Sequence, residues 1–196
     1  MNIAINGFGR IGRAVFKIAL ERKLNVVAIN DVHGAESSAY LLKYDSIYGP
    51  YKGKINVKKN SIVVNGKKII VLSEREPEKL PWKKLGVDIV IESTGAFTDA
   101  REAAKHLKAG AKKVVITAPA KNPDVTIVMG VNEKIYDKSK HNIVSIASCT
   151  TNCLAPVVKI LNDNFCIKRG FMTTIHAYTA DQRLVDAPHK DLRRAR

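Results

Sequence analysis

Short apolar runs alternate with helical patterns along most of this 196-residue chain. Six runs rich in β-branched residues predict strands at residues 2–6, 26–31, 87–92, 114–118, 126–130 and 143–147. Apolar side chains recur at the helical period over residues 10–20, and a second helical pattern covers residues 99–108. Strands that alternate with helices are typical of βαβ units, so the pattern predicts an α/β fold with a mostly parallel sheet.

An excursion interrupts this alternation between its two halves. Residues 54–72 hold three short β-rich runs, and Asn65-Gly66 joins the last two. Both residues of an Asn-Gly pair accept positive φ, which favours a tight hairpin turn. We therefore expect a β-hairpin around residues 65 and 66.

The pattern changes at Cys149. A helical segment to about Asn162 is followed by a strand-like run at 171–176 and then by a polar, irregular stretch up to residue 196. Fewer than 50 residues cannot readily enclose a core of their own. We expect a first domain at residues 1–148 and an incomplete second domain at residues 149–196, so that the chain is a fragment or needs further material.

Charge is the unusual feature of the composition. The chain has 33 Lys+Arg against 18 Asp+Glu, a formal net charge of +15, which raises the question of a polyanionic partner. The lysines, however, are spread in pairs beside apolar runs, no aromatic residues interleave with them, and only residues 193–196 form a basic cluster. We expect solvated lysine faces rather than a nucleic-acid site.

Cysteine usage and the apolar runs indicate the compartment. The three cysteines lie in one short region and make a poor disulfide framework. No uninterrupted apolar stretch approaches the length of a membrane span, and no charged region precedes the first apolar run. We expect a cytoplasmic protein without a membrane partner.

A glycine-rich turn follows the first predicted strand. Gly7-Phe8-Gly9-Arg10-Ile11-Gly12 opens the first helix, and its glycines suit a tight turn, close approach of backbone to a pyrophosphate, and close packing of helix on strand. Asp31 lies 19 residues beyond Gly12, at the end of the next strand, where it can accept hydrogen bonds from ribose hydroxyls. The joint pattern predicts a Rossmann-type domain that binds NAD. An acid repels a 2′-phosphate, which disfavours NADP without excluding it.

Cys149 follows an apolar strand and begins a helix, where unsatisfied N–H groups and the helix dipole favour a thiolate. His176 is the best candidate for its base, because it alone among five histidines ends an apolar strand in the second domain. Three others (His33, His106, His141) sit among polar residues and are expected at the surface, and His189 lies in the irregular stretch. Each residue alone also has a structural explanation, a small buried cysteine or a hydrogen-bonded core histidine.

Five segments, at residues 6–13, 41–46, 92–95, 147–156 and 176–179, resemble the phosphorylating glyceraldehyde-3-phosphate dehydrogenase family. The resemblance runs along the whole chain and covers roughly the first three fifths of that family's subunit, ending inside its α+β catalytic domain. It implies oxidation of glyceraldehyde 3-phosphate to 1,3-bisphosphoglycerate in glycolysis or gluconeogenesis. Cys149 would carry the hemithioacetal and thioester, and His176 would activate the thiol. By itself the shortened chain is expected to be inactive.

The same resemblance assigns further residues and partners. Cofactor contacts would come from Gly7, Gly9, Arg10, Ile11, Gly12, Asp31, Arg75 and Thr117. Substrate and phosphate contacts would come from Ser148, Thr150, Thr179, Asp181 and Arg196. No metal site is expected, because Cys153 has no second pair and is taken as packed, and Cys166 as part of the core. The partners would be glyceraldehyde 3-phosphate, inorganic phosphate and further copies in a homotetramer.

Three alternatives stay open. Strictly NAD-dependent relatives commonly carry Leu before the proline of Asp186-Ala187-Pro188, and relatives that accept NADP carry Ala followed by Ser, so Ala187 with Pro188 is intermediate. Erythrose-4-phosphate dehydrogenases resemble this family closely and use the same cysteine chemistry. A noncatalytic dinucleotide-binding or RNA-binding module is the alternative from another class.

Overall fold

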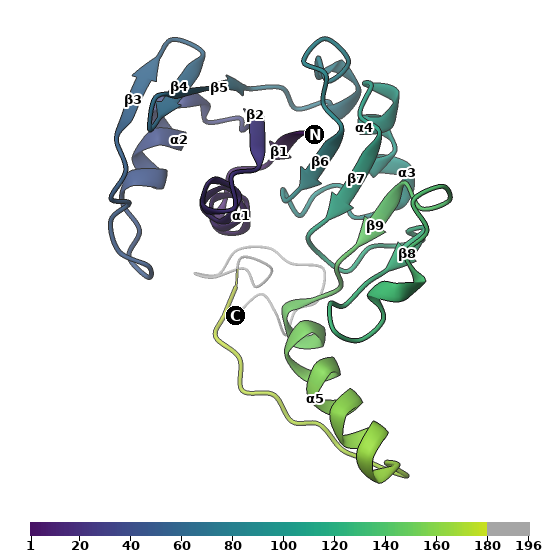
Figure 1. Ribbon diagram of the computed structural model, residues 1–196. Coiled ribbons are helices and arrows are strands. Elements are labelled where there is room, and N and C mark those ends of the chain that lie inside the picture. The colour runs from purple at the N-terminus through teal and green to yellow at the C-terminus, as the bar shows by residue number, and fades with distance from the viewer. Residues whose placement is uncertain (180–196) are drawn as a thin grey trace, which may run out of the picture. The chain divides into compact units, whose positions relative to one another are not determined.

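The computed structural model describes residues 1–179, and a nine-stranded sheet forms the core of this part of the chain (Figure 1). The strand order across the sheet is β3-β4-β5-β2-β1-β6-β7-β9-β8. The strands are β1 Asn2–Asn6, β2 Asn25–Asn30, β3 Ile55–Lys58, β4 Ser61–Val64, β5 Lys67–Leu72, β6 Ile89–Glu92, β7 Lys113–Ile116, β8 Val125–Thr126 and β9 Ile143–Ser145.

Helices lie between several of these strands and after the last one. They are α1 Arg10–Glu21, α2 Gly34–Lys43, α3 Ala100–Ala103, α4 Lys105–Lys108 and α5 Cys149–Phe165, with 3₁₀ turns η1 Pro77–Lys79 and η2 Glu133–Ile135. The predicted helix at 99–108 is thus two short helices that meet at Ala104. Helix α2 was not anticipated, because its glycine, its two serines and its tyrosine favour helix formation less than alanine or leucine does. No helix in the described range is long and apolar enough to cross a membrane.

Most strand pairs in the sheet are parallel. Strand β1 pairs in parallel with β2 and β6, and the parallel ladder continues to β5 on one side and to β7, β9 and β8 on the other. Strands β3, β4 and β5 pair antiparallel. The predicted α/β class with a mostly parallel sheet is confirmed. The segment taken as an excursion is part of the same sheet, because β5 pairs with β2.

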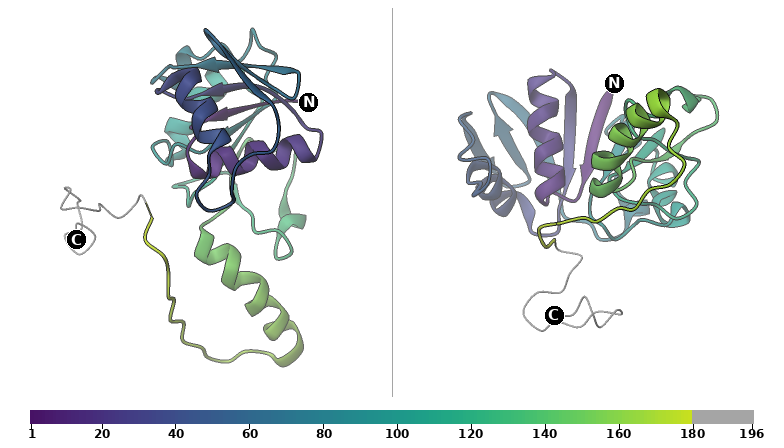
Figure 2. Two further views of the ribbon diagram at one scale, coloured as in Figure 1. Left: turned by 90° about the vertical axis from the view of Figure 1, so that its left-hand side faces the viewer. Right: turned by 90° about the horizontal axis from the view of Figure 1, so that it is seen from below.

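Apolar side chains cover both faces of the sheet. On one face Ile5 and Ile29 pack with the buried side of α1, including Phe16, and with Leu42 of α2. On the other face Ala4, Ala28 and Val90 pack against the segment around Trp82, and Val114 packs against α3. The right-hand view of Figure 2 shows α1 running alongside β1. This two-sided cover is why the central strands are apolar at nearly every position.

Local turn chemistry explains where two elements begin and end. Asn65 and Gly66 both have positive φ, 51° and 84°, so the predicted hairpin between β4 and β5 is confirmed. The strand predicted at 126–130 is shorter than expected. Asn132 receives a hydrogen bond from the Val128 N–H and donates one to the Thr126 carbonyl, which turns the chain after Thr126.

Contacts divide the chain into two compact units, Met1–Ile160 and a second that begins at Leu161. The domain boundary between residues 148 and 149 stays a prediction. The strand predicted at 171–176 is wrong, because these residues are described without strand pairing. A strand needs a ladder partner, and the described residues of the second unit form none. Cys166, expected in a core, is exposed, and so is Cys153, expected to be packed, because no residue of α5 is buried.

Candidate active site

The glycine-rich turn joins β1 to α1 and packs closely against neighbouring backbone at Gly7 and Gly12. Gly7 has φ +88°, and a Cβ there would lie 2.7 Å from the Thr94 backbone nitrogen. A Cβ on Gly12 would lie 2.1 Å from the Gly7 carbonyl oxygen, so α1 packs directly on the turn. A Cβ on Gly9, in contrast, would meet no atom within 4 Å. The turn therefore leaves open space beside Gly9, where a ligand can approach the backbone.

The start of α1 is suited to bind an anion. Its N-cap residue is Gly9, which contributes no side-chain hydrogen bond to the first turn. The first N–H groups of a helix lack intrahelical acceptors and lie at the positive end of the helix dipole. A phosphate group can accept hydrogen bonds from these N–H groups and carries the negative charge that the helix dipole favours. Ile11, on the same turn, is 52% exposed.

Asp31 follows β2 and is held from two sides. Its Oδ2 accepts a hydrogen bond from the Phe8 N–H at 2.9 Å, and its Oδ1 accepts bonds from the His33 N–H at 3.0 Å and the His33 ring at 2.9 Å. Burial raises the pKa of Asp31, but these hydrogen bonds outweigh burial, so that its pKa lies below the usual range. The result is a fixed carboxylate next to the glycine-rich turn. The His33 ring, not anticipated as its partner, lies exposed beside it.

Arg10 makes an ion pair that the sequence did not suggest. Its Nη1 lies 2.9 Å from Asp45 Oδ1, and Lys17 Nζ lies 3.0 Å from Asp45 Oδ2. The backbone N–H groups of Tyr48 and Ile47, followed by these two cations, hold the pKa of Asp45 well below its usual range. Arg10 is therefore held beside the start of α1 by a side chain that is almost fully buried.

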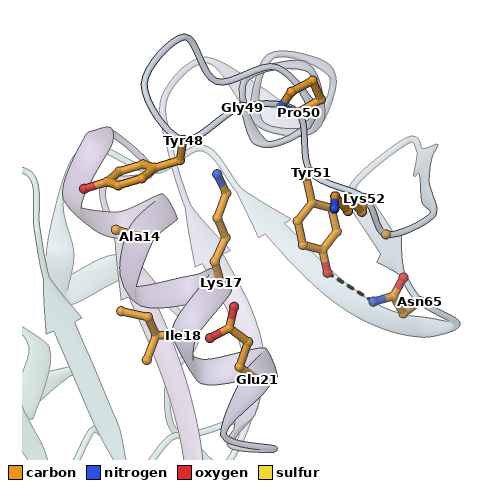
Figure 3. A pocket seen from close by; sticks show the side chains of 11 residues that line it. Ala14, Lys17, Ile18, Glu21, Tyr48, Gly49, Pro50, Tyr51, Lys52 and Asn65 are labelled. Carbon is orange, nitrogen blue, oxygen red and sulfur yellow. Dashed lines mark hydrogen bonds between the residues drawn. The ribbon is translucent and has the colours of Figure 1, made fainter.

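A groove of about 510 Å³ lies on the outer side of α1. Figure 3 shows the Lys17 side chain extending between Tyr48 and Tyr51, and Tyr51 Oη accepts a hydrogen bond from Asn65 Nδ2 at 3.1 Å. Later turns of α1 and the loop after Tyr48 line this groove, and the glycine-rich turn does not. The groove is thus distinct from the predicted nucleotide edge.

Two further predicted cofactor contacts lie at the same edge of the sheet. Thr117 follows β7, and its N–H and hydroxyl donate to the Glu92 carbonyl at 3.0 and 3.1 Å. Arg75 follows β5 and is exposed. Parallel strands bring their carboxyl ends to one edge, which is where ligands bind in open α/β sheets.

Cys149 is the first residue of α5, and a short turn separates it from the carboxyl end of β9. The turn between them contains Ala147 in the left-handed region, at φ +59°. Residues other than glycine rarely adopt this conformation, and such strain is common at functional sites. Asn152 Nδ2 donates to the carbonyls of Ile146 and Ser148, at 2.7 and 2.9 Å, and so stabilises the turn. The turn places an exposed thiol at a helix N-terminus.

The predicted substrate residues next to Cys149 shape this helix start. Ser148 is the N-cap, because its Oγ accepts a hydrogen bond from the Thr151 N–H at 3.0 Å. Thr150 is the second residue of α5. Both lie at the carboxyl edge of the sheet together with the glycine-rich turn and Asp31.

The remaining predicted residues belong to the second unit or lie beyond the described range. His176 Nδ1 donates to the neighbouring Ala177 carbonyl at 2.5 Å, and His176 and Thr179 are exposed within the second unit. Asp181, Ala187, Pro188, His189 and Arg196 lie outside the described residues.

One histidine lies in the core instead of at the predicted surface position. His106, expected at the surface, is 0% exposed and bonded to Trp82 and Glu92. The signal for its burial was present, since His106 follows the buried Ala100 and Ala103 at helical spacing of three. Local polarity was the weaker guide, because the neighbouring Lys105 and Lys108 are not buried while His106 is.

Comparisons with known proteins identify relatives along the whole chain. Residues 1–100 match the family described as "Glyceraldehyde 3-phosphate dehydrogenase, NAD binding domain", and residues 148–196 match its C-terminal domain. Enzymes named glyceraldehyde-3-phosphate dehydrogenase from Geobacillus stearothermophilus and Thermotoga maritima are 60% and 57% identical to this chain, over 100% and 99% of its length. Glyceraldehyde-3-phosphate dehydrogenase 1 of Bacillus subtilis is 59% identical. The chain spans 59% of the length of each of these relatives.

Proposed function

Given that this chain belongs to the glyceraldehyde-3-phosphate dehydrogenase family, we propose that the protein catalyses the NAD-dependent oxidative phosphorylation of glyceraldehyde 3-phosphate to 1,3-bisphosphoglycerate. One observation carries the proposal. The turn after β9 presents Cys149 at the N-terminus of α5, on the same sheet edge as the glycine-rich turn and Asp31. A nucleophilic thiol and a dinucleotide site on one edge suit the oxidation of an aldehyde.

The residues at the edge fit a dinucleotide. Gly9 leaves room for a pyrophosphate beside the uncapped start of α1, and the Asp31 carboxylate suits the ribose hydroxyls. When bound, NAD accepts the hydride that leaves the aldehyde carbon. Arg10, Ile11, Arg75 and Thr117 would complete the contacts. The Asp31 charge, next to a site for an unphosphorylated ribose, favours NAD over NADP.

Cys149 would carry the covalent chemistry. Its thiolate adds to the aldehyde carbon, and the new oxyanion takes a proton from the His176 imidazolium to give a hemithioacetal. Oxidation returns the hydroxyl proton to His176 and leaves a thioester on the Cys149 sulfur. An oxygen of inorganic phosphate then attacks the thioester carbonyl, the C–S bond breaks, and acyl phosphate leaves with the thiolate regenerated.

The helix start supplies the electrostatics for these steps. Backbone N–H groups near Cys149 are positioned to donate to an oxyanion at the former aldehyde carbon, a contribution that is usually large in acyl transfer. Ser148, Thr150, Thr179, Asp181 and Arg196 would bind the substrate phosphate and the attacking phosphate through hydroxyl and guanidinium donors. A homotetramer in the cytoplasm is part of the same proposal and follows from the family.

The test measures both products of the protein expressed from its gene. With glyceraldehyde 3-phosphate, NAD and phosphate, we expect NADH absorbance to rise and acyl phosphate to form in equal amounts. A Cys149→Ser variant should lose at least about 10³-fold in kcat, because serine is a far weaker nucleophile without a thiolate. Equal turnover by this variant would refute the proposal. Erythrose 4-phosphate as a parallel substrate distinguishes the neighbouring enzyme class.

A further inference from the structure

A line of buried polar side chains crosses the sheet just beneath its carboxyl edge. Asn30, Asn6 and Glu92 end β2, β1 and β6, and they lie in register with one another. They are 4%, 1% and 2% exposed. His106 of α4 and Trp82, each 0% exposed, continue the line on the same face. We call these five residues the polar belt.

Hydrogen bonds connect the polar belt from end to end. Asn30 Nδ2 donates to Asn6 Oδ1 at 2.7 Å, and Asn6 Nδ2 donates to Glu92 Oε2 at 2.6 Å. His106 Nε2 lies 3.0 Å from the same Glu92 oxygen, and Trp82 Nε1 lies 2.9 Å from His106 Nδ1. Because an indole nitrogen only donates, Nδ1 of His106 is the acceptor. The ring proton therefore sits on Nε2 and is donated to Glu92.

Glu92 lies at the centre of the polar belt, and both of its carboxylate oxygens accept hydrogen bonds. Its Oε2 receives the Asn6 amide and the His106 ring, and its Oε1 receives the Thr94 N–H at 2.8 Å and the Thr94 hydroxyl. All four partners are donors, which a carboxylate satisfies and a carboxamide does not. A buried carboxylate is costly unless such bonds compensate its burial.

The belt fixes three loops of the candidate NAD site. Glu92 holds Thr94, whose backbone lies against the glycine-rich turn at Gly7, and the Glu92 carbonyl holds Thr117. At the other end of the belt, Asn30 Nδ2 donates to the Glu74 carbonyl and Asn30 Oδ1 accepts the Glu74 N–H, both at 2.8 Å. Glu74 is adjacent to Arg75. Each of these loops contains or touches a predicted cofactor residue.

We propose that Glu92, held by His106, is a positioning residue for NAD: it sets the spacing of the cofactor loops without touching the cofactor. This inference rests on the proposed function, since it assigns these loops to NAD. A site whose contacts are held in place by buried hydrogen bonds loses affinity when those bonds are mispaired, even if the contact residues themselves remain. The hydrogen bonds of the polar belt hold the cofactor loops in this way, from just beneath the carboxyl edge of the sheet.

The decisive variant is Glu92→Gln, which keeps the side-chain shape and turns part of the acceptor surface into a donor. At least one of its four donor partners then faces an N–H group. Asp88→Asn is the matched control, because Asp88 precedes the opposite end of β6 and also accepts a backbone N–H, from Asn2, and a lysine, Lys112. A second control, Val64→Ala, removes fully buried atoms in β4 and measures the effect of lost stability alone.

The experiment titrates the 196-residue chain and its variants with NAD, at a temperature well below each melting temperature. We expect Glu92→Gln to weaken NAD binding by about tenfold or more, and both controls to stay within about twofold of the unchanged chain. Amide hydrogen exchange should accelerate at Thr94, whose N–H donates to the Glu92 side chain, in Glu92→Gln and in neither control. Thr117, whose N–H donates to the retained Glu92 backbone carbonyl, serves as the internal reference. Trp82→Phe, which removes the indole N–H donor together with part of the buried ring, should show a smaller effect in the same direction.

Each outcome bears on one of the two proposals. Unchanged NAD affinity and unchanged exchange at Thr94 in a folded Glu92→Gln chain would overturn the positioning role. Equal weakening by Val64→Ala would also overturn it, since affinity would then follow stability. If the unchanged chain binds no NAD, the assignment of the loops to NAD fails, while faster exchange at Thr94 in Glu92→Gln still supports the positioning of its loop by Glu92. If Glu92→Gln does not fold, Trp82→Phe decides by the same two measurements.

Discussion

At its amino edge the sheet carries Asn2, Asn25 and Asp88, and at its carboxyl edge it carries Asn6, Asn30 and Glu92. Asn25 Nδ2 donates to Asn2 Oδ1 at 2.7 Å, the same distance as the Asn30 to Asn6 bond. The residue types and the Asn–Asn bond are thus alike at the two ends of the same strands. The acids differ in their donors, because Glu92 accepts from the Asn6 side chain and Asp88 from the Asn2 backbone N–H. The side chains of the first set are accessible to solvent, and those of the second are buried.

This difference has an energetic meaning. A hydrogen bond at the exposed edge replaces a bond to water and contributes little, whereas a buried polar group left unpaired costs its full desolvation. Chain direction decides which edge binds a ligand, since helix N-termini and connecting loops gather at the carboxyl ends of parallel strands. Substitutions at the carboxyl edge should therefore alter ligand binding, and substitutions at the amino edge should alter stability alone.

The largest effect is expected from a pair of glycines. Gly12→Ala places a Cβ 2.1 Å from the Gly7 carbonyl, so the turn must shift, at a cost of roughly 1–3 kcal/mol. Gly86→Ala, at the amino edge, is strained by its φ of +60° at a similar cost of about 1–2 kcal/mol. Calorimetry should show that both melt earlier, and NAD titration should show binding lost in Gly12→Ala only. Loss of binding in both would remove the distinction between the edges.

The helix start at Cys149 provides the next effect. Iodoacetamide at mildly acidic pH should modify Cys149 at least about tenfold faster than Cys153 or Cys166, because only Cys149 lies at a helix N-terminus. Peptide mapping by mass spectrometry gives the three rates. All three thiols are exposed, so accessibility alone predicts similar rates. Similar rates would show that the carboxyl edge does not activate this thiol.

A smaller change is expected in cofactor choice. Asp31→Gly removes the carboxylate that repels a 2′-phosphate and accepts from ribose hydroxyls, and the NAD-to-NADP affinity ratio should fall by about tenfold. Binding titrations with both dinucleotides give the ratio. Asp88→Asn, which removes an acid at the amino edge, should leave the ratio unchanged. A constant ratio in Asp31→Gly would mean that Asp31 does not contact the ribose.

The smallest effect concerns pH and salt. Asp31 and Asp88 both have a lowered pKa in the folded state, so each contributes stability above the ordinary aspartate pKa of about 3.9, and this is lost as pH falls through the lowered value. The main cause for Asp88 is the exposed Lys112, whereas backbone N–H groups lower the pKa of Asp31. Urea unfolding should therefore show that about 1 M salt weakens the Asp88 contribution more. Comparison of Asp31→Asn with Asp88→Asn isolates each contribution.

The sequence by itself determined the fold class, the glycine-rich turn, the hairpin at Asn65-Gly66, and the placement of Cys149 at the start of a helix. Each is encoded locally, in periodicity, in positive-φ residues, or in the order of strand and helix. The family followed from the same short segments. Sequence reasoning can predict such features because all of their residues lie within one turn or one element.

Only the tertiary structure decided that β5 joins the parallel sheet, that Asp45 holds Arg10, and that His106 is buried against Glu92. These partners are far apart in sequence, and strand order and side-chain register bring them together. The polar belt shows the reason most clearly. The sequence does not distinguish the two asparagines of β1, Asn2 and Asn6. Packing from the other strands and from α4 buries Asn6, whereas Asn2 stays accessible to solvent.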